Sequence, residues 1–187
     1  MAPAKKYTTA GAFRRALEER LKRTFTNEHT DLNRLRREVS FDRLLARLFR
    51  DAAPPWFLKG GYVLELRYKA ARSTVDIDLT VQSIAVFAGE DQNQIVREML
   101  QNAADVSLGD WFEFTFGPPT MDLTAAPYGG ARYPVEARMD ERILARFHLD
   151  AGIGDGVSPP VDAIVYRDWL GFAGIPTAQV QMIAREQ

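Results

Sequence analysis

The chain has 187 residues, of which 46% are hydrophobic and 26% charged, and it contains no cysteine. These values predict one soluble globular domain with a proper core, and they exclude a disulfide framework and a thiolate metal site. No apolar run approaches the ~20 residues of a membrane span, and residues 1–30 lack the apolar segment of a signal peptide. We therefore expect a cytoplasmic protein with no membrane partner.

The net charge of −1 hides an asymmetry along the chain. Residues 1–50 carry 13 Lys and Arg against 6 Asp and Glu, whereas the remainder carries 11 against 19. A basic segment followed by an acidic one is typical of a protein that binds a polyanion such as nucleic acid. The candidate contacts are Arg34, Arg36 and Arg37. The alternative is that these side chains only form solvated helix faces.

The N-terminal residues 1–53 are predicted to be helical. A first helix, capped by Thr8 or Thr9, has apolar residues every four positions at Phe13, Leu17, Leu21 and Phe25. A second helix is expected from about Asp31 to Ala52 and is ended by Pro54-Pro55. Residues 54–187 would form the core that these helices precede, within one compact domain.

The most informative stretch is 57–81, FLKGGYVLELRYKAARSTVDIDLTV. It predicts a short strand (56–59), a Gly60-Gly61 turn, a helix (62–69) and a strand (74–82). In the second strand, alternation places Asp76 and Asp78 on one face. Carboxylates at i and i+2 lie about 7 Å apart at Cα, so their oxygens can converge on one divalent cation or on a pair of cations.

The glycine pair lies at the expected N-terminus of the intervening helix. Free N–H groups and the positive end of the helix dipole favour a phosphate there, and the absence of a β-carbon lets that phosphate approach the backbone. A phosphate cradle followed by metal-binding carboxylates is a layout for nucleotidyl transfer. Taken singly, a Gly-Gly pair is more often a turn, and an Asp-Ile-Asp strand is often a half-solvated edge.

The rest of the chain predicts one helix and several strands. The helix, 90–104, would place Ile95, Met99 and Ala103 on one face and would cover the sheet as a β-α-β crossover. Strands are expected at 111–116, at 133–139 and 142–151 as a hairpin around Asp140-Glu141, and at 161–166 and 180–184. The turn signals Pro118-Pro119 and 127–130 separate them.

Residues 60–61 and 72–79 together resemble the signature of the AbiEii/AbiGii nucleotidyltransferase toxins, members of the polymerase-beta-like nucleotidyltransferase superfamily. The resemblance implies that Gly60 and Gly61 hold the nucleotide phosphates and that Arg72 and Thr74 are the Arg-x-Thr before the acids. It also implies that Asp76 and Asp78 bind metal. Many members carry Ser where this chain has Gly61, and the spacer between the glycines and the acids is a few residues longer here.

The resemblance also implies a third acid on a neighbouring strand. In the predicted hairpin, Leu144, Arg146, His148 and Asp150 share one face, and Ile143, Ala145, Phe147, Leu149 and Ala151 share the other. Asp150 fits the family's strand that ends in Asp before a Gly-x-Gly-Asp loop. It would complete the metal site and draw the proton from an attacking hydroxyl, while Arg146 and His148 would project beside it toward phosphates or an RNA backbone.

The predicted fold is therefore α/β (α+β): a nucleotidyltransferase-type mixed, mainly antiparallel sheet with N-terminal helices and a covering helix. The resemblance implies Mg²⁺ or Mn²⁺ as cofactor and an NTP as substrate, whose nucleoside monophosphate is transferred to a hydroxyl. It also implies a toxin of a type IV-like toxin–antitoxin or abortive-infection system, a cognate antitoxin encoded nearby, and a tRNA 3′ end as a reasonable acceptor.

Two alternatives stay open. A small-molecule nucleotidyltransferase of the aminoglycoside-modifying kind would share the glycines and acids without needing a basic N-terminal half. A non-catalytic nucleotide-binding module is the other, because the family's downstream Ala-Glu-Lys and Lys-Asp-x-x-Asp motifs have no match in 160–187. A chain shortened in this way is expected to keep metal binding while its catalysis is weak or absent.

Overall fold

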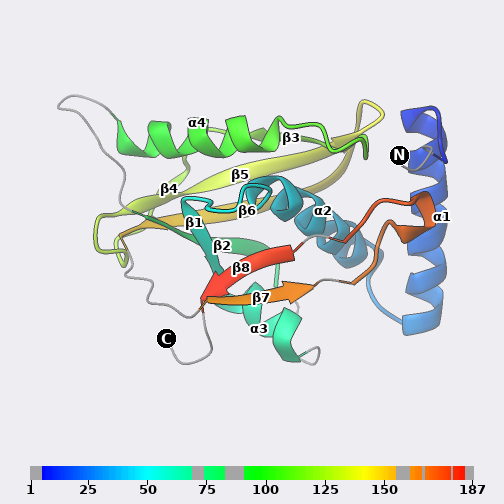
Figure 1. Cartoon of the computed structure of the whole chain (residues 1–187), viewed down its shortest axis with the longest axis horizontal. Coiled ribbons are helices and arrows are strands. Elements are labelled where there is room, and N and C mark those ends of the chain that lie inside the picture. The colour runs from blue at the N-terminus through cyan, green and yellow to red at the C-terminus, as the bar shows by residue number, and fades with distance from the viewer. Residues whose placement is uncertain are drawn as a thin grey trace.

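The computed structural model describes residues 6–68, 74–82, 91–154, 161–165, 167–177 and 179–183 (Figure 1). The helices are α1 (Ala10–Glu28), α2 (Leu32–Leu48), α3 (Gly60–Tyr68) and α4 (Gln92–Ala104), with a short 3-10 helix at Gly171–Ala173. The strands are β1 (Trp56–Lys59), β2 (Asp76–Val81), β3 (Glu113–Phe116), β4 (Met121–Asp122), β5 (Gly130–Met139), β6 (Arg142–Ile153), β7 (Val161–Val165) and β8 (Gln179–Ile183). Among the described residues, no helix combines the length and the apolar character needed to cross a membrane.

The strands form one sheet in the order β3-β5-β6-β2-β1-β8-β7, and β4 pairs with β5. Neighbouring strands are antiparallel except for β2 with β6 and β1 with β8. The predicted mixed, mainly antiparallel sheet is therefore confirmed. Because β6 and β3 both run parallel to β2, the segment β2-α4-β3 is the crossover expected from the sequence, and α4 packs on β3 and β5 (Figure 1).

Both N-terminal helices are capped by a side chain, and Thr9 is one of the two residues predicted to cap the first. The hydroxyl of Thr9 accepts a hydrogen bond from Ala12 N, and the carboxylate of Asp31 accepts one from Arg34 N. These bonds satisfy N–H groups that have no partner inside the helix. The first helix continues to Glu28 and leaves Phe25, one of the predicted apolar positions, 46% exposed. The second ends at Leu48, well before the two prolines.

Helix α2 packs across the sheet and connects the N-terminal segment with the core. The ring of Phe41 meets the rings of Phe147 on β6 and Tyr62 on α3 edge-on, at 4.7 and 5.0 Å between centroids. All three rings are buried, and edge-to-face pairs of this kind add about 0.5–1.5 kcal/mol each beyond the burial of area. The helical segment 1–53 thus shares one hydrophobic core with the sheet.

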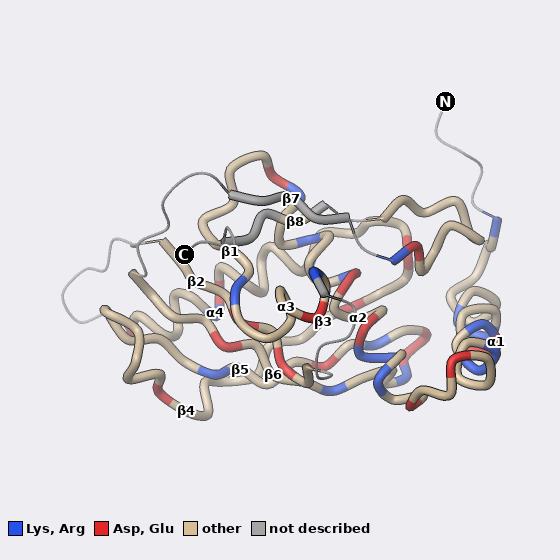
Figure 2. Tube along the Cα trace, turned by 90° about the horizontal axis from the view of Figure 1, so that it is seen from below, with Lys and Arg blue, Asp and Glu red and all other residues tan. Residues whose placement is uncertain are grey.

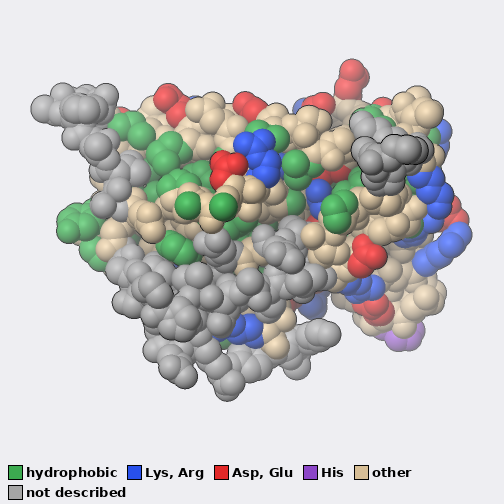
Figure 3. Space-filling model, viewed as in Figure 1, with side chains coloured by type: hydrophobic (Ala, Val, Ile, Leu, Met, Phe, Trp, Pro, Cys, Tyr) green, Lys and Arg blue, Asp and Glu red, His purple; other side chains and the backbone are tan. Residues whose placement is uncertain are grey.

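In α4 the buried face lies one residue further along than predicted. Val96, Leu100 and Ala104 are buried, whereas Met99 and Ala103 lie at the margin of the core. On the face seen in Figure 3, apolar side chains gather below α4 and beside the C-terminal end of α2, and basic side chains follow α1 at the outer edge.

The hairpin β5–β6 turns at Asp140 and Glu141, which both have positive φ, 55° and 59°. The register shifts between Ala137 and Arg138, and a bulge of this kind changes which face the following residues take. For this reason Leu144 is buried and Ile143 is 37% exposed, the reverse of the predicted alternation at these two positions. From Phe147 to Asp150 the predicted faces hold.

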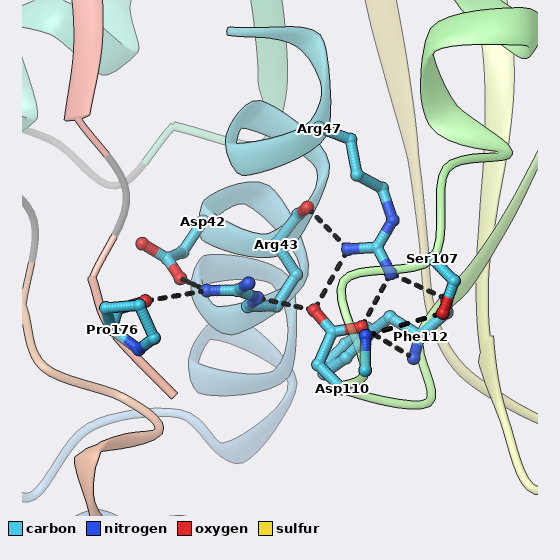
Figure 4. Close-up of polar contacts among 8 residues, drawn as sticks. Asp42, Arg43, Arg47, Ser107, Asp110, Phe112 and Pro176 are labelled. Atoms are coloured by element: carbon cyan, nitrogen blue, oxygen red, sulfur yellow. Dashed lines mark hydrogen bonds and ion pairs between the residues drawn. The ribbon is translucent and has the colours of Figure 1, made fainter. Parts of the chain in front are cut away.

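A buried ion network fixes α2 to the segment before β3 (Figure 4). Both carboxylate oxygens of Asp110 accept hydrogen bonds from Arg47, at 2.6 and 3.0 Å, and Oδ2 also accepts one from Arg43 at 2.7 Å. Burial raises the pKa of Asp110, but the hydrogen bonds and charges of the two arginines outweigh it and hold that pKa below its usual value. Arg43 and Arg47, which belong to the basic charge of residues 1–50, therefore bind Asp110 inside the fold.

Candidate active site

Three carboxylates come together on one face of the sheet, across two adjacent strands. Asp76 and Asp78 lie on β2, and their neighbours Ile77 and Leu79 are fully buried on the other face. Strand β6 runs parallel to β2 with Asp150 directly beside Asp78. Adjacent strands are about 4.8 Å apart, so the predicted third acid lies next to the predicted pair.

The glycine pair opens α3 directly after β1, and β1 pairs with the acid-bearing strand, with Lys59 opposite Asp78. Gly60 has φ of 73°, a conformation that disfavours other residues. A β-carbon at Gly60 would stand 2.7 Å from the carboxyl carbon of Asp78, and one at Gly61 would stand 3.0 Å from the hydroxyl of Thr74. The glycine pair thus lies directly beside Asp78, as the spacing of the motif predicts.

Arg132 on β5 stands among the three carboxylates, and the sequence did not point to it. Its Nε and Nη2 donate to the two oxygens of Asp150 at 2.7 and 2.8 Å, and Nη2 lies 3.4 Å from Oδ2 of Asp76. The other oxygen of Asp76 lies 3.3 Å from Nδ1 of His148. The hydrogen bonds that Arg132 donates to Asp150, followed by the charges of all three acids, raise the pKa of Arg132, which keeps it a cation at every relevant pH.

Arg132 was missed because the expected strand began at Tyr133. Strand β5 begins three residues earlier, at Gly130, where the sequence carries turn signals. The signal that could have found Arg132 is the alternation of the strand itself, because 131, 133, 135, 137 and 139 are buried apolar residues.

The donor set suits a hard divalent cation, since Mg²⁺ and Mn²⁺ prefer carboxylate oxygens. Burial and then the neighbouring charge of Asp150 raise the pKa of Asp78. Among the described residues, however, no three acidic or histidine side chains are grouped closely enough to hold a metal ion. The oxygens of Asp150 and Asp76 are directed at Arg132 and His148 instead.

A pocket of about 770 Å³ adjoins the acids. Asp76, Arg132 and His148 line it together with Arg146 and, from α2, Arg37. Figure 2 shows acidic and basic stretches following one another around β5, β6 and α3. Three arginines against Asp76 and Glu136 give the lining of this groove a net positive charge, which favours phosphates.

The three candidate arginines of α2 have different surroundings. Arg34 donates to Glu38 and Glu65 at 2.6 and 2.7 Å, and Arg36 donates to both oxygens of Glu18. Arg37 lines the groove, and its Nε has no hydrogen-bond partner within the described part of the chain. That Nε is itself buried, so Arg37 is the candidate contact for a ligand because it lines the groove, which Arg34 and Arg36 do not. Arg146 is held by Glu136 but is 68% exposed.

Glu65 on α3 is a further residue that the sequence did not indicate. One of its oxygens accepts from Arg34, and the other accepts from the backbone N–H of Thr74 at 2.8 Å. It thereby holds Thr74 against the start of the helix that carries the glycines. Arg72, the other member of the Arg-x-Thr pair, lies outside the described residues.

Comparison with known proteins shows the family and a similar fold. Residues 43–187 match the family model described as nucleotidyl transferase AbiEii toxin, Type IV TA system. A solved structure of MenT4, a nucleotidyltransferase toxin from Mycobacterium tuberculosis H37Rv, is similar with a TM-score of 0.60 and 14% sequence identity. The match covers 90% of this chain and 55% of that chain, so this chain spans about half the length of the MenT4 chain. No curated protein matches.

The fold is therefore similar to that of a solved nucleotidyltransferase toxin. The chain belongs to the AbiEii family of nucleotidyltransferase toxins, whose model covers most of its length, and the resemblance stated from the sequence is confirmed.

Proposed function

We propose that this chain transfers a nucleoside monophosphate from an NTP to a hydroxyl, with a tRNA 3′ end as acceptor, as the cytoplasmic toxin of a toxin–antitoxin pair. The observation that carries the proposal is the pairing of Asp78 with Asp150 across β2 and β6, with Asp76 on the same face and Gly60 against Asp78. In this arrangement the phosphate cradle and the acids face the same space.

Asp76, Asp78 and Asp150 would hold Mg²⁺ or Mn²⁺, which when bound neutralises charge developing on the triphosphate and activates the attacking oxygen. Gly60 and Gly61 would receive the triphosphate at the N-terminus of α3, where backbone N–H groups are free to donate. Thr74, held by Glu65, lies beside Gly61, so its hydroxyl would border the same phosphates.

The acceptor would approach along the groove that begins at Asp76. Arg37, Arg146 and His148 line the groove, and cationic side chains there would contact the phosphates of a polynucleotide without reading its sequence. Asp150, which binds Arg132 of the groove lining, would orient the terminal hydroxyl or accept its proton.

The test is transfer from each of the four α-labelled NTPs to total tRNA in the presence of Mg²⁺. Asp78→Asn removes a metal ligand with almost no change of shape, and it is expected to abolish labelling of the tRNA. Glu113→Gln changes an exposed carboxylate on the edge strand β3 and should leave labelling unchanged. The folding of both variants is checked by thermal unfolding.

Labelling that survives in Asp78→Asn would contradict the proposal. Transfer to aminoglycosides but not to tRNA would show that the acceptor is a small molecule. NTP binding by calorimetry without transfer to either acceptor would identify a nucleotide-binding module.

A further inference from the structure

Arg132 belongs to the acidic site and to the groove at the same time. Its guanidinium makes a bidentate contact with Asp150 and reaches Asp76, and its side chain, 30% exposed, lines the groove. In the β5–β6–β2 register it stands opposite Asp150, which stands beside Asp78. Arginine and a divalent cation therefore have the same carboxylate oxygens as partners.

The two compete for these oxygens. A bidentate contact occupies both oxygens of Asp150 in the plane of the guanidinium, and a dication placed among the same carboxylates would repel the arginine at short range. The orientation of the carboxylates toward Arg132 explains why the described residues form no ready metal cluster.

We propose that Arg132 is a resident counter-ion, which a divalent cation displaces from Asp150 and Asp76 and which then binds a phosphate of a polynucleotide in the groove. This rests on the proposed function, because it takes the three acids as the metal site. Arg132 is thus a positioning residue that couples the binding of metal to the binding of an acceptor phosphate. Without metal, the guanidinium of Arg132 pairs with the acids. With metal bound, the guanidinium leaves the acids and is available to a phosphate in the groove.

The first experiment measures Mn²⁺ binding to the full chain in the absence of nucleotide, from the electron paramagnetic resonance signal of the free ion. Arg132→Gln removes the competitor and should tighten Mn²⁺ binding about tenfold, and Arg132→Lys, which cannot form the bidentate contact, should tighten it less. Arg138→Gln is the matched control. It lies on the same strand, is ion-paired with Glu136, and should leave the affinity as in wild type.

The second experiment measures the binding of a short single-stranded RNA by fluorescence anisotropy, with Mn²⁺ and with EDTA. Metal should strengthen RNA binding in wild type and in Arg138→Gln, and this effect should disappear in Arg132→Gln. Coupling between two ligands is reciprocal, so RNA should strengthen Mn²⁺ binding in the same two proteins. If metal simply bridged the RNA to the acids, its effect would persist without Arg132.

The outcomes separate this inference from the proposed function. No Mn²⁺ binding by wild type or by either Arg132 variant would overturn both. Mn²⁺ binding that is unchanged or weaker in the Arg132 variants would overturn the displacement alone. A metal effect on RNA binding that remains in Arg132→Gln would overturn the coupling. If Arg132→Gln does not fold, Arg132→Lys decides each point.

Discussion

Gly60 is adjacent in space to Asp78, although 18 positions separate them in the sequence. A β-carbon at Gly60 would stand 2.7 Å from the carboxyl carbon of Asp78, closer than non-bonded carbon atoms approach. The glycine therefore has a role besides admitting a phosphate, since it leaves room for the acid that follows the helix. This contact explains why the glycines and the acids occur together as one motif.

Gly60→Ala is expected to impair the site more than Gly61→Ala. The first substitution strains a residue at positive φ and pushes the carboxylate of Asp78 away, whereas the second meets only the hydroxyl of Thr74, at 3.0 Å. We expect Gly60→Ala to cost about 1–3 kcal/mol of stability and to weaken Mn²⁺ binding tenfold or more. Urea unfolding measures the loss of stability and Mn²⁺ titration measures the loss of affinity. Equal losses in the two variants would contradict this prediction.

Asp110→Asn is expected to destabilise the fold by about 3–5 kcal/mol, because it leaves Arg43 and Arg47 buried beside a neutral group. The pKa of Asp110 is lowered in the folded state, so its contribution is fully present above the pKa of the unfolded chain, about 4. As pH falls through the lower folded pKa, the contribution is lost. The difference in free energy of unfolding between wild type and variant should therefore be constant from pH 7 to 5 and shrink below pH 4.

Urea unfolding at pH 7, 5 and 3.5 tests this prediction, with Asp105→Asn as control. Asp105 is an exposed acid just after α4, and its substitution should stay within about 0.5 kcal/mol of wild type. A difference for Asp110→Asn that persists unchanged at pH 3.5 would assign its role to packing rather than to charge.

The sequence predicted most elements of the fold because their signals are local. Strand β1, for example, has the predicted bounds, and β2 has the predicted buried face, since alternation and turn residues act over a few positions. The placement of Asp150 beside Asp78 came instead from the resemblance. No local pattern fixes which strands of a sheet become neighbours.

The interactions that the sequence could not predict are those between distant charged residues. Charge counting over 1–50 cannot distinguish Arg47, which is buried against Asp110, from Arg37, which lines the groove. The sequence did not predict Arg132 for a related reason. Its position among the acids depends on where β5 begins and on the register of that strand with β6.

Glu65 and Glu38 allow the positioning of Thr74 to be tested apart from stability. Both carboxylates pair with Arg34, but only Glu65 also accepts the backbone N–H of Thr74. Glu65→Ala should therefore destabilise by about 1–3 kcal/mol and also weaken NTP binding several-fold, because Thr74 is released from Gly61. Glu38→Ala should lower stability only. Calorimetric titration of NTP with Mn²⁺ measures the affinity, and equal NTP affinities in the two folded variants would contradict a positioning role for Glu65.

The last prediction concerns Arg37 and the acceptor. The two other arginines of α2 are held by Glu18, Glu38 and Glu65, whereas Arg37 lines the groove and has a donor without a partner among the described residues. Arg37→Ala should therefore weaken tRNA binding at low salt and reduce the slope of log K against log salt by about 0.7–0.9, the loss of one phosphate contact. The loss should be alike for all tRNA sequences, since phosphate contacts do not read bases.

Filter binding of tRNA across a salt series measures the slope, with Arg36→Ala as the matched control. Both substitutions remove one arginine of α2, so they change the net charge equally and differ only in what the guanidinium contacts. Arg36→Ala should keep the wild-type slope and should lose some stability through its bond with Glu18. Equal slopes in wild type and Arg37→Ala would leave the groove without a role in nucleic-acid binding, and a small-molecule acceptor would then be the better interpretation of the same site.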